Sequence, residues 1–321
     1  MGEEGSADRR DISTSRQEMK YYRFKTFTTS YFFPDLAKDQ QYMYGLYSPY
    51  GGRLSQIYWY LFRNCKMVRG LTQVKEEDLP FPYDTIRNAD GTDSLMAFNM
   101  GSPGVEQKIS ILGYDNQTGL PFFAKFSQKP AALKLTENEI KVYRLLSNTG
   151  LTPQLLSFKK EDNCSYLKAE YVPGIRPERR ELTDEILDLC ISLASYHIDS
   201  YKEFGGLRHS LSHGDFCPWN MLCRDGKIRL IDWELADERP LGYDLLTYIC
   251  QVSALLDSKK RLIEAVEENK AMICKYFLYF GIEQYVPHLK AFAKIKAKYE
   301  HDKGTSLLYQ KYAELATDLS I

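Results

Sequence analysis

The sequence predicts an α+β protein in which a strand-rich N-terminal lobe is followed by a helical C-terminal lobe. Between residues 94 and 172, short apolar stretches alternate with turn residues, as is typical of strands. Beyond residue 244, apolar residues recur at helical spacing over three segments. Strands that come first and helices that follow are characteristic of the α+β class.

The individual elements follow from the same patterns. We expect strands at 94–99, 108–114, 120–126, 155–158 and 166–171, and a helix at 136–149 that Gly150 ends. Further helices are expected at 54–61, 183–201, 244–256, 259–280 and 284–317. Pro80, Pro82 and the polar stretch 84–93 predict an irregular connection, and the charges of 294–303 predict a solvated helix face.

Composition excludes several classes of function. The chain has 321 residues, and its 42 Lys and Arg balance 43 Asp and Glu, so bulk charge gives no support for nucleic-acid binding. No apolar stretch approaches the roughly 18 residues of a membrane span. Residues 1–20 are charged, lack the apolar run of a secretion signal and are expected to form a disordered tail. Seven cysteines without a CxxC pair indicate reduced thiols, so we expect a cytoplasmic protein.

The stretch 212–246 carries the chemistry. His213-Gly-Asp215 is followed by Asn220, and then by two apolar runs, 221–223 and 228–231, that a turn separates. The second run leads directly to Asp232, so a hairpin brings two carboxylates together. Phosphoryl transfer needs such a set: one carboxylate orients the attacking hydroxyl, while an amide and a second carboxylate hold Mg²⁺ against the phosphates.

At these residues the sequence resembles the aminoglycoside phosphotransferase and choline kinase superfamily, which has the protein-kinase-like fold. The resemblance is carried by H-x-D-x-x-x-x-N from His213 to Asn220, by Pro218 within it, and by I-D-W-E at 231–234. It is sharp over 212–246, extends weakly over 94–250 and does not cover 1–93.

The resemblance implies a role for each matching residue. Asp215 would accept or orient the acceptor hydroxyl, and Asn220 and Asp232 would bind Mg²⁺. Lys125 would contact the phosphates of ATP or GTP, with Glu139 as its ion-pair partner. The hinge at Glu170 and Val172 would contact the base of the nucleotide, and the loop at Ser102 would cover its phosphates. His213 and Asp244 would support the catalytic loop.

Several positions keep a second interpretation. Thr136-x-x-Glu139 also fits a capping box, which would leave Glu137 to pair with Lys125. Glu234 is equally compatible with metal binding and with a surface acid. The phosphate loop contains Pro103, which has no N–H for a phosphate. His209, His213, Cys217 and Cys223 lie close in sequence, but the cysteines lack the paired spacing of a zinc site.

The prediction is therefore a bilobal, protein-kinase-like enzyme with a tail at 1–20, an N-terminal extension of unknown role at 21–93, a nucleotide-binding lobe at 94–172 and a catalytic lobe at 173–321. It would use ATP or GTP with Mg²⁺ to phosphorylate a hydroxyl of a small molecule: a sugar, an amino alcohol or an aminoglycoside-like compound. The alternatives are a kinase of protein or polysaccharide and a catalytically silent nucleotide- or partner-binding module.

Overall fold

The computed structural model describes residues 19–48, 52–177, 181–198, 203–257 and 259–319. The expected tail at 1–20 lies outside this part except for its last two residues, and Lys20 already begins a strand. The chain forms two compact units, residues 1–103 with 109–121, and residues 104–108 with 122–321. The expected lobe at 94–172 is thus shared between the two units, and its functional boundaries stay a prediction.

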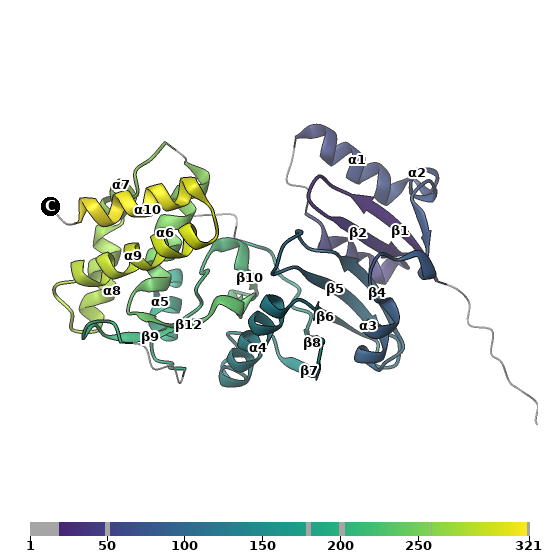
Figure 1. Cartoon of the computed structure of the whole chain (residues 1–321), viewed down its shortest axis with the longest axis horizontal. Coiled ribbons are helices and arrows are strands. Elements are labelled where there is room, and N and C mark those ends of the chain that lie inside the picture. The colour runs from purple at the N-terminus through teal and green to yellow at the C-terminus, as the bar shows by residue number, and fades with distance from the viewer. Residues whose placement is uncertain (1–18, 49–51, 178–180, 199–202, 258, 320–321) are drawn as a thin grey trace, which may run out of the picture. The chain divides into compact units, whose positions relative to one another are not determined.

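The first unit contains antiparallel strands in the order β3-β1-β2-β4-β5 (Figure 1). The strands are β1 (Lys20–Lys25), β2 (Ser30–Pro34), β3 (Gln73–Lys75), β4 (Ser94–Asn99) and β5 (Lys108–Asp115). The helices are α1 (Arg53–Asn64), α2 (Lys66–Gly70) and α3 (Tyr83–Asp90), with 3₁₀ turns η1 (Lys38–Leu46) and η2 (Glu76–Asp78). Since β2 pairs with β4, the extension at 21–93 adds strands to the sheet that begins the expected lobe.

Buried aromatic residues of 21–62 form a large part of the core of this unit. Helix α1 lies beside β1 and β2 (Figure 1). Its buried residues Trp59 and Phe62 pack against aromatic rings of both strands. The ring of Phe24 on β1 is 4.8 Å from Trp59 and 5.1 Å from Phe62 between centroids. Edge-on and offset ring pairs add to the free energy gained from burial. The sheet and α1 are therefore held together mainly by aromatic packing.

The expectation of an irregular connection at 84–93 is wrong, because 83–90 forms helix α3. Tyr83, Ile86 and Ala89 recur at helical spacing and are buried on one face. Gly91 ends the helix in the left-handed conformation, with φ 71°. The polar residues between these apolar positions obscured the period.

The second unit begins with antiparallel strands in the order β6-β8-β7 and continues into helices. Its strands are β6 (Leu120–Ser127), β7 (Leu155–Glu161), β8 (Cys164–Glu170), β9 (His209–Ser212), β10 (Met221–Arg224), β11 (Lys227–Leu230) and β12 (Asp237–Pro240). Strands β10–β11 and β9–β12 form two antiparallel pairs, and 3₁₀ turns lie at η3 (Pro218–Asn220) and η4 (Trp233–Leu235).

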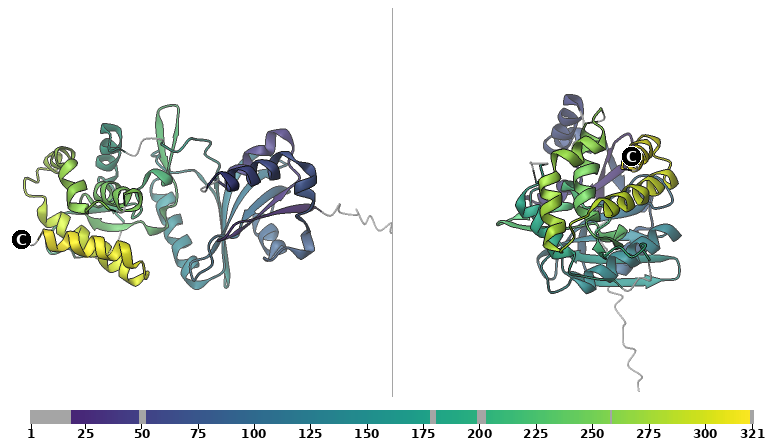
Figure 2. Two further views of the ribbon diagram at one scale, coloured as in Figure 1. Left: turned by 90° about the horizontal axis from the view of Figure 1, so that it is seen from above. Right: turned by 90° about the vertical axis from the view of Figure 1, so that its left-hand side faces the viewer.

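The helices of this unit are α4 (Pro130–Leu145), α5 (Asp184–Leu193), α6 (Tyr243–Leu256), α7 (Leu262–Glu268), α8 (Lys270–Tyr279), α9 (Val286–Asp302) and α10 (Ser306–Asp318). Helices α9 and α10 pack side by side (Figure 2), and α6 is buried around most of its circumference. The α+β prediction is confirmed.

The helix boundaries differ from the prediction in physically understandable ways. The segments 259–280 and 284–317 each form two helices, and the second break falls at Gly304, whose φ is 73°. Helix α4 starts six residues before the expected 136, at Pro130, because proline suits the first helical position. Helix α5 ends at Leu193, so the expected continuation to 201 is wrong up to residue 198, and residues 199–201 lie outside the described part. Lys296 and Glu300 are buried, so 294–303 is not a fully solvated face.

All seven cysteines are free thiols. Among the described residues, no helix combines the length and apolarity needed to cross a lipid bilayer.

Phe62→Ala should lower the free energy of unfolding by about 3–5 kcal/mol, because it removes a fully buried ring from the aromatic core. Tyr60→Ala on the same helix removes a side chain that is 65% exposed and should change stability by less than about 0.5 kcal/mol. Denaturant unfolding of both variants measures the difference, and equal effects would contradict this description of the core.

Candidate functional site

Lys125 and Glu139 form a buried ion pair between strand β6 and helix α4. The Nζ atom of Lys125 lies 2.7 Å from Oε2 and 3.0 Å from Oε1 of Glu139, whose side chain is fully buried. Because α4 begins at Pro130, Glu139 lies well inside the helix and is not its capping residue. Thr136 instead donates to the carbonyl oxygen of Ala132 at 3.0 Å. The ion-pair interpretation is therefore correct in its geometry, and the capping box is not present.

The fallback partner for the lysine, Glu137, faces elsewhere. Its Oε1 accepts from Lys160 Nζ at 2.7 Å, and both side chains are largely exposed. A surface pair of this kind contributes little to stability.

Asp232 joins the same cluster from the segment that follows β11. Its Oδ1 lies 2.6 Å from Lys125 Nζ. The backbone of Asp232 is left-handed, with φ 68° and ψ 55°, a conformation that Asp tolerates better than most residues. This turn in the chain directs the carboxylate toward Lys125 instead of along the strand.

Glu234 and Lys108 complete the cluster. Lys108 Nζ forms an ion pair with Glu234 Oε2, which also lies 3.8 Å from Lys125 Nζ. The Glu234 side chain is 17% exposed, so it is part of the site and not a surface acid. Asn138 on α4 holds this segment by donating to the carbonyl oxygens of Glu234 at 3.0 Å and Ala236 at 2.6 Å. No sequence pattern points to Lys108 or Asn138, because both act on partners far away in the chain.

The charges in the cluster shift one another's ionisation. Burial disfavours the charged form of Lys125, but Asp232, Glu139 and Glu234 outweigh it and hold the lysine pKa well above its ordinary value. Burial also opposes the ionised form of Asp232, yet Lys125 and Lys108 lower its pKa to about 2. For Glu234, burial and the negative charge of Asp232 raise the pKa. At neutral pH the site thus contains an ammonium and an ionised Asp232.

Asp215 lies on a separate loop that begins at the end of β9. The side-chain amide of Asn220 donates to the backbone oxygen and to Oδ2 of Asp215, at 2.9 Å in both cases. Trp219 Nε1 donates to the same Oδ2 at 3.4 Å. The Cys217 thiol lies 3.6 Å from Oδ1, and burial strongly raises its pKa, so it stays neutral. These contacts hold the carboxylate in one orientation.

Asp244 braces the loop from the start of α6. It accepts from Ser212 Oγ at 2.6 Å, from the backbone N–H of His213 at 2.8 Å and from that of Gly214 at 3.3 Å. Burial raises the Asp244 pKa, although His213 and these donors oppose the rise. Asp244 therefore lies where the sequence analysis expects it, against the start of the loop that carries Asp215.

His213 links the loop to the segment before Asp232. Its Nε2 lies 3.0 Å from the carbonyl oxygen of Ile231, and its Nδ1 accepts from the N–H of Asp215 at 3.3 Å. These two bonds assign the proton to Nε2. The N–H of Ile231 in turn donates to the backbone oxygen of Asn220 at 3.0 Å. The histidine is fully buried, so it acts as a support and does not face solvent.

The glycine between His213 and Asp215 is required by its surroundings. Gly214 has φ 84°, and a Cβ atom placed on it would lie 2.2 Å from the backbone oxygen of Leu235. A larger residue therefore has no room there, which explains why this loop contains Gly.

The other predicted site residues have the following surroundings. Glu170 ends β8, and its Oε2 accepts from Arg229 Nη1 at 2.7 Å, while Val172 is buried just beyond it. Ser102 belongs to the first unit. The roles of these three residues in nucleotide binding stay predictions.

The donor set suits a hard divalent cation. Carboxylate oxygens of Glu139, Asp232 and Glu234 lie within 4.8 Å of one another. The side-chain nitrogen of Asn220 donates to Asp215, which leaves the side-chain oxygen to serve as a further metal ligand. Mg²⁺ prefers such oxygen ligands, usually with only one or two carboxylates.

Residues 182–266 match the phosphotransferase enzyme family. The resemblance predicted from the motifs is confirmed over this segment. The matched segment contains Asp215, Asn220, Asp232 and Asp244. The sequence matches no curated protein.

Three solved structures are similar to the chain at low identity. The amicoumacin kinase hAmiN, in complex with AMP-PNP, Ca²⁺ and Ami, is 11% identical, with 66% of this chain and 86% of that chain covered at a TM-score of 0.46. A Plasmodium vivax ethanolamine kinase is 13% identical, with 67% and 79% covered at 0.44. An aminoglycoside-3'-phosphotransferase of type VIII is 15% identical, with 63% and 88% covered at 0.40.

Gly214→Ala should lower the free energy of unfolding by about 3 kcal/mol or more, because left-handed strain adds to a direct clash with the backbone of Leu235. Gly226→Ala is the matched control: its φ is 70°, but nothing lies within 4 Å of the added Cβ. The control should cost only about 1–2 kcal/mol. Thermal or denaturant unfolding distinguishes them, and equal losses would show that the close approach at Gly214 does not matter.

Proposed function

We propose that this protein transfers the γ-phosphoryl group of ATP or GTP to a hydroxyl of a small molecule. One observation carries the proposal. Hydrogen bonds join the loop that presents Asp215 to the segment of Asp232, whose carboxylate belongs to the ion cluster of Lys125. A cytoplasmic location, without nucleic-acid or membrane partners, remains our prediction.

In this proposal Lys125 contacts the nucleotide phosphates while Glu139 keeps its ammonium in place. Asp232 and Asn220 hold Mg²⁺, with the carboxylate of Glu234 nearby to add to the negative field. Bound Mg²⁺ neutralises charge on the phosphate oxygens. The resemblance further assigns the phosphate loop to Ser102 and the contact with the base to Glu170 and Val172, and both assignments stay predictions.

Asp215 orients the acceptor hydroxyl and takes its proton as the oxygen attacks the γ-phosphorus. The bond from that phosphorus to the bridging oxygen breaks, and ADP or GDP leaves. Its Oδ2 is occupied by Asn220 and Trp219, whereas Oδ1 has only the weak thiol contact of Cys217 among these bonds. Oδ1 is therefore the atom best suited to accept from a hydroxyl. Because the cluster is held rigidly before substrate arrives, catalysis rests on positioning and electrostatics.

Lys296 on α9 bears on the choice of acceptor. It is 2% exposed, lies 3.5 Å from Gln251 Oε1, and faces the rings of Tyr243, Tyr299 and Tyr312 at 5.8–6.0 Å. Its positive charge counteracts the burial that raises the pKa of Cys217, the residue in contact with Asp215. Lys296 is thus a cation whose charge acts on the residue in contact with Asp215, and for that reason we favour a neutral hydroxyl compound, such as a sugar, over a polycation.

Asp215→Ala should lower the rate of phosphate transfer by about 10²–10⁴ while nucleotide affinity stays nearly unchanged, because the carboxylate acts on the acceptor and not on the nucleotide. A metabolite library is screened with γ-labelled ATP and GTP, and the variant is assayed on each acceptor found. Asp188→Ala, which removes an exposed carboxylate from α5, is the control and should keep full activity.

Wild-type activity in Asp215→Ala would refute the assignment of this residue. Labelling of protein or polysaccharide alone would favour a macromolecular acceptor. Nucleotide binding without transfer to any acceptor would identify a silent binding module.

Neutral sugars should exceed aminoglycosides in kcat/KM by at least about tenfold, since like charges placed together cost several kcal/mol. Lys296→Met should shrink this ratio, whereas Lys294→Met, which removes an exposed charge from the same helix, should leave it unchanged. Steady-state assays on both acceptor classes measure the ratio. A higher rate on the polycation with the wild-type protein would contradict the proposed acceptor class.

A further inference from the structure

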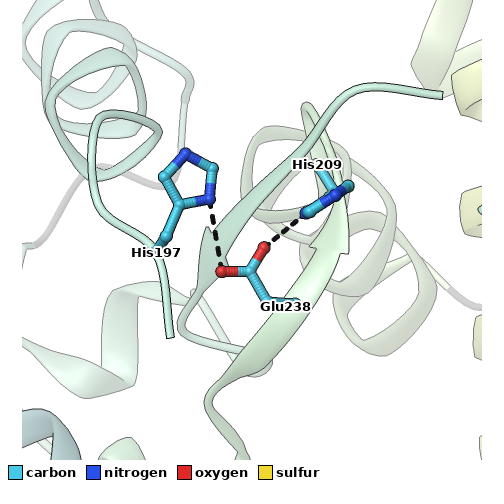
Figure 3. A group of neighbouring side chains, drawn as sticks. All are labelled: His197, His209 and Glu238. Atoms are coloured by element: carbon cyan, nitrogen blue, oxygen red, sulfur yellow. Dashed lines mark hydrogen bonds and ion pairs between the residues drawn. The ribbon is translucent and has the colours of Figure 1, made fainter. Parts of the chain in front are cut away.

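Three side chains with metal-binding atoms converge in the second unit, away from the ion cluster of Lys125. His197 lies just after α5, His209 begins β9, and Glu238 lies on the neighbouring strand β12 (Figure 3). The strands pair antiparallel, with Pro240 opposite His209 and Glu238 opposite Leu211. His209 and Glu238 are therefore diagonal neighbours on one face of the strand pair.

The two histidines approach the carboxylate from opposite sides, one to each oxygen (Figure 3). His209 Nδ1 lies 2.7 Å from Glu238 Oε2, and His197 Nδ1 lies 3.3 Å from Oε1. One ligand atom from each residue lies within 4.8 Å of the other two. Ligand atoms about 2.1 Å from a tetrahedral zinc ion are about 3.4 Å apart, so small side-chain rotations are enough to surround an ion.

The carboxylate of this group is buried and both imidazoles are exposed, an arrangement that suits a bound metal ion. The Glu238 side chain is only 1% exposed, and the N–H of Ile198 donates to its Oε1 at 2.7 Å. The side chains of His197 and His209 are 59% and 40% exposed. A buried carboxylate is stable when a positive charge compensates it. Within the described residues, its ion-pair partners are these two histidines, which are positive only when protonated.

Two imidazoles and one carboxylate select a particular class of ion. Imidazole nitrogens suit zinc and related transition metals, whereas Mg²⁺ and Ca²⁺ prefer all-oxygen sites. Three protein ligands leave a fourth position for water, and the exposure of both imidazoles gives solvent access to it.

We propose that His197, His209 and Glu238 bind one Zn²⁺ ion, with water as the fourth ligand. A proton on either Nδ1 moves to Nε2 or leaves when that nitrogen binds the metal. The ion fastens the segment after α5 to strands β9 and β12. Strand β9 leads directly into the loop of Asp215, and β12 follows the segment of Asp232, so the ion stabilises the support of the catalytic residues.

The zinc ligands weighed from the sequence are a different set. His213 is fully buried and bonded to Ile231, and Cys217 contacts Asp215, so neither joins His209. His197 and Glu238 lie too far from His209 in the chain to form a short ligand motif. Only the pairing of β9 with β12 and the path of the chain after α5 bring them together.

The test is calorimetric titration of the chelator-treated full-length protein with ZnCl₂, in excess Mg²⁺ so that the carboxylates near Lys125 do not compete. We expect one Zn²⁺ per chain, and a higher melting temperature with the ion. Glu238→Gln retains an acceptor for the N–H of Ile198, and His209→Asn removes one ligand. Each should weaken Zn²⁺ binding by at least about tenfold and abolish the thermal shift, since even residues that merely support a ligand cost 10–100-fold.

His301→Asn is the matched control, because His301 forms an exposed pair with Asp302, its Nδ1 lying 3.3 Å from the carboxylate. It should leave Zn²⁺ affinity unchanged. Absence of Zn²⁺ binding by the wild-type protein, wild-type affinity in the site variants, or an equal loss in His301→Asn would each overturn the proposal. If circular dichroism shows that Glu238→Gln is unfolded, the largely exposed His197→Asn takes its place with the same expected loss.

Discussion

Part of the second unit is organised around a buried positive charge, the ammonium group of Lys125. Removing a charge from water costs several kcal/mol unless opposite charges surround it. Glu139 from α4 and Asp232 from the segment after β11 supply that compensation, and Glu234 adds to it. Strand β6, helix α4 and the 232–234 segment must therefore come together for any of these groups to be stable. The packing of these three elements follows from this electrostatic requirement.

Asp215 depends on a different kind of constraint. No cation pairs with it among the contacts described above; donors from Asn220 and Trp219 fix its direction. Asp244 holds the loop by three hydrogen bonds to its first residues, and the close approach at Gly214 leaves no room for a side chain. Local backbone strain at Asp232 is tolerated because Lys125 binds its carboxylate. Hydrogen bonds thus hold the loop of Asp215 in place, whereas paired charges hold the segment of Asp232.

Much of this arrangement could be predicted from residue patterns. Strand β4 lies at the expected 94–99, and the pairing of Lys125 with Glu139 and the bracing by Asp244 have the predicted geometry. Helix α3 was missed because its apolar period is short and interrupted by polar residues. Lys108 could not be predicted, since its partner Glu234 is 126 residues away. Local signals reveal elements and motifs, whereas pairs distant in the chain depend on how elements pack.

By itself, the sequence determined the α+β class, the loop of His213, Asp215 and Asn220, and the segment of Asp232, because these features depend on short-range periodicity and on the order of chemical groups along the chain. Only the tertiary structure decided that Glu234 lies inside the ion cluster, that Glu139 is free of a capping role, and that His197 and His209 meet at Glu238. Those outcomes depend on which elements pack together and on which charges are buried, and no local pattern of residues contains that information.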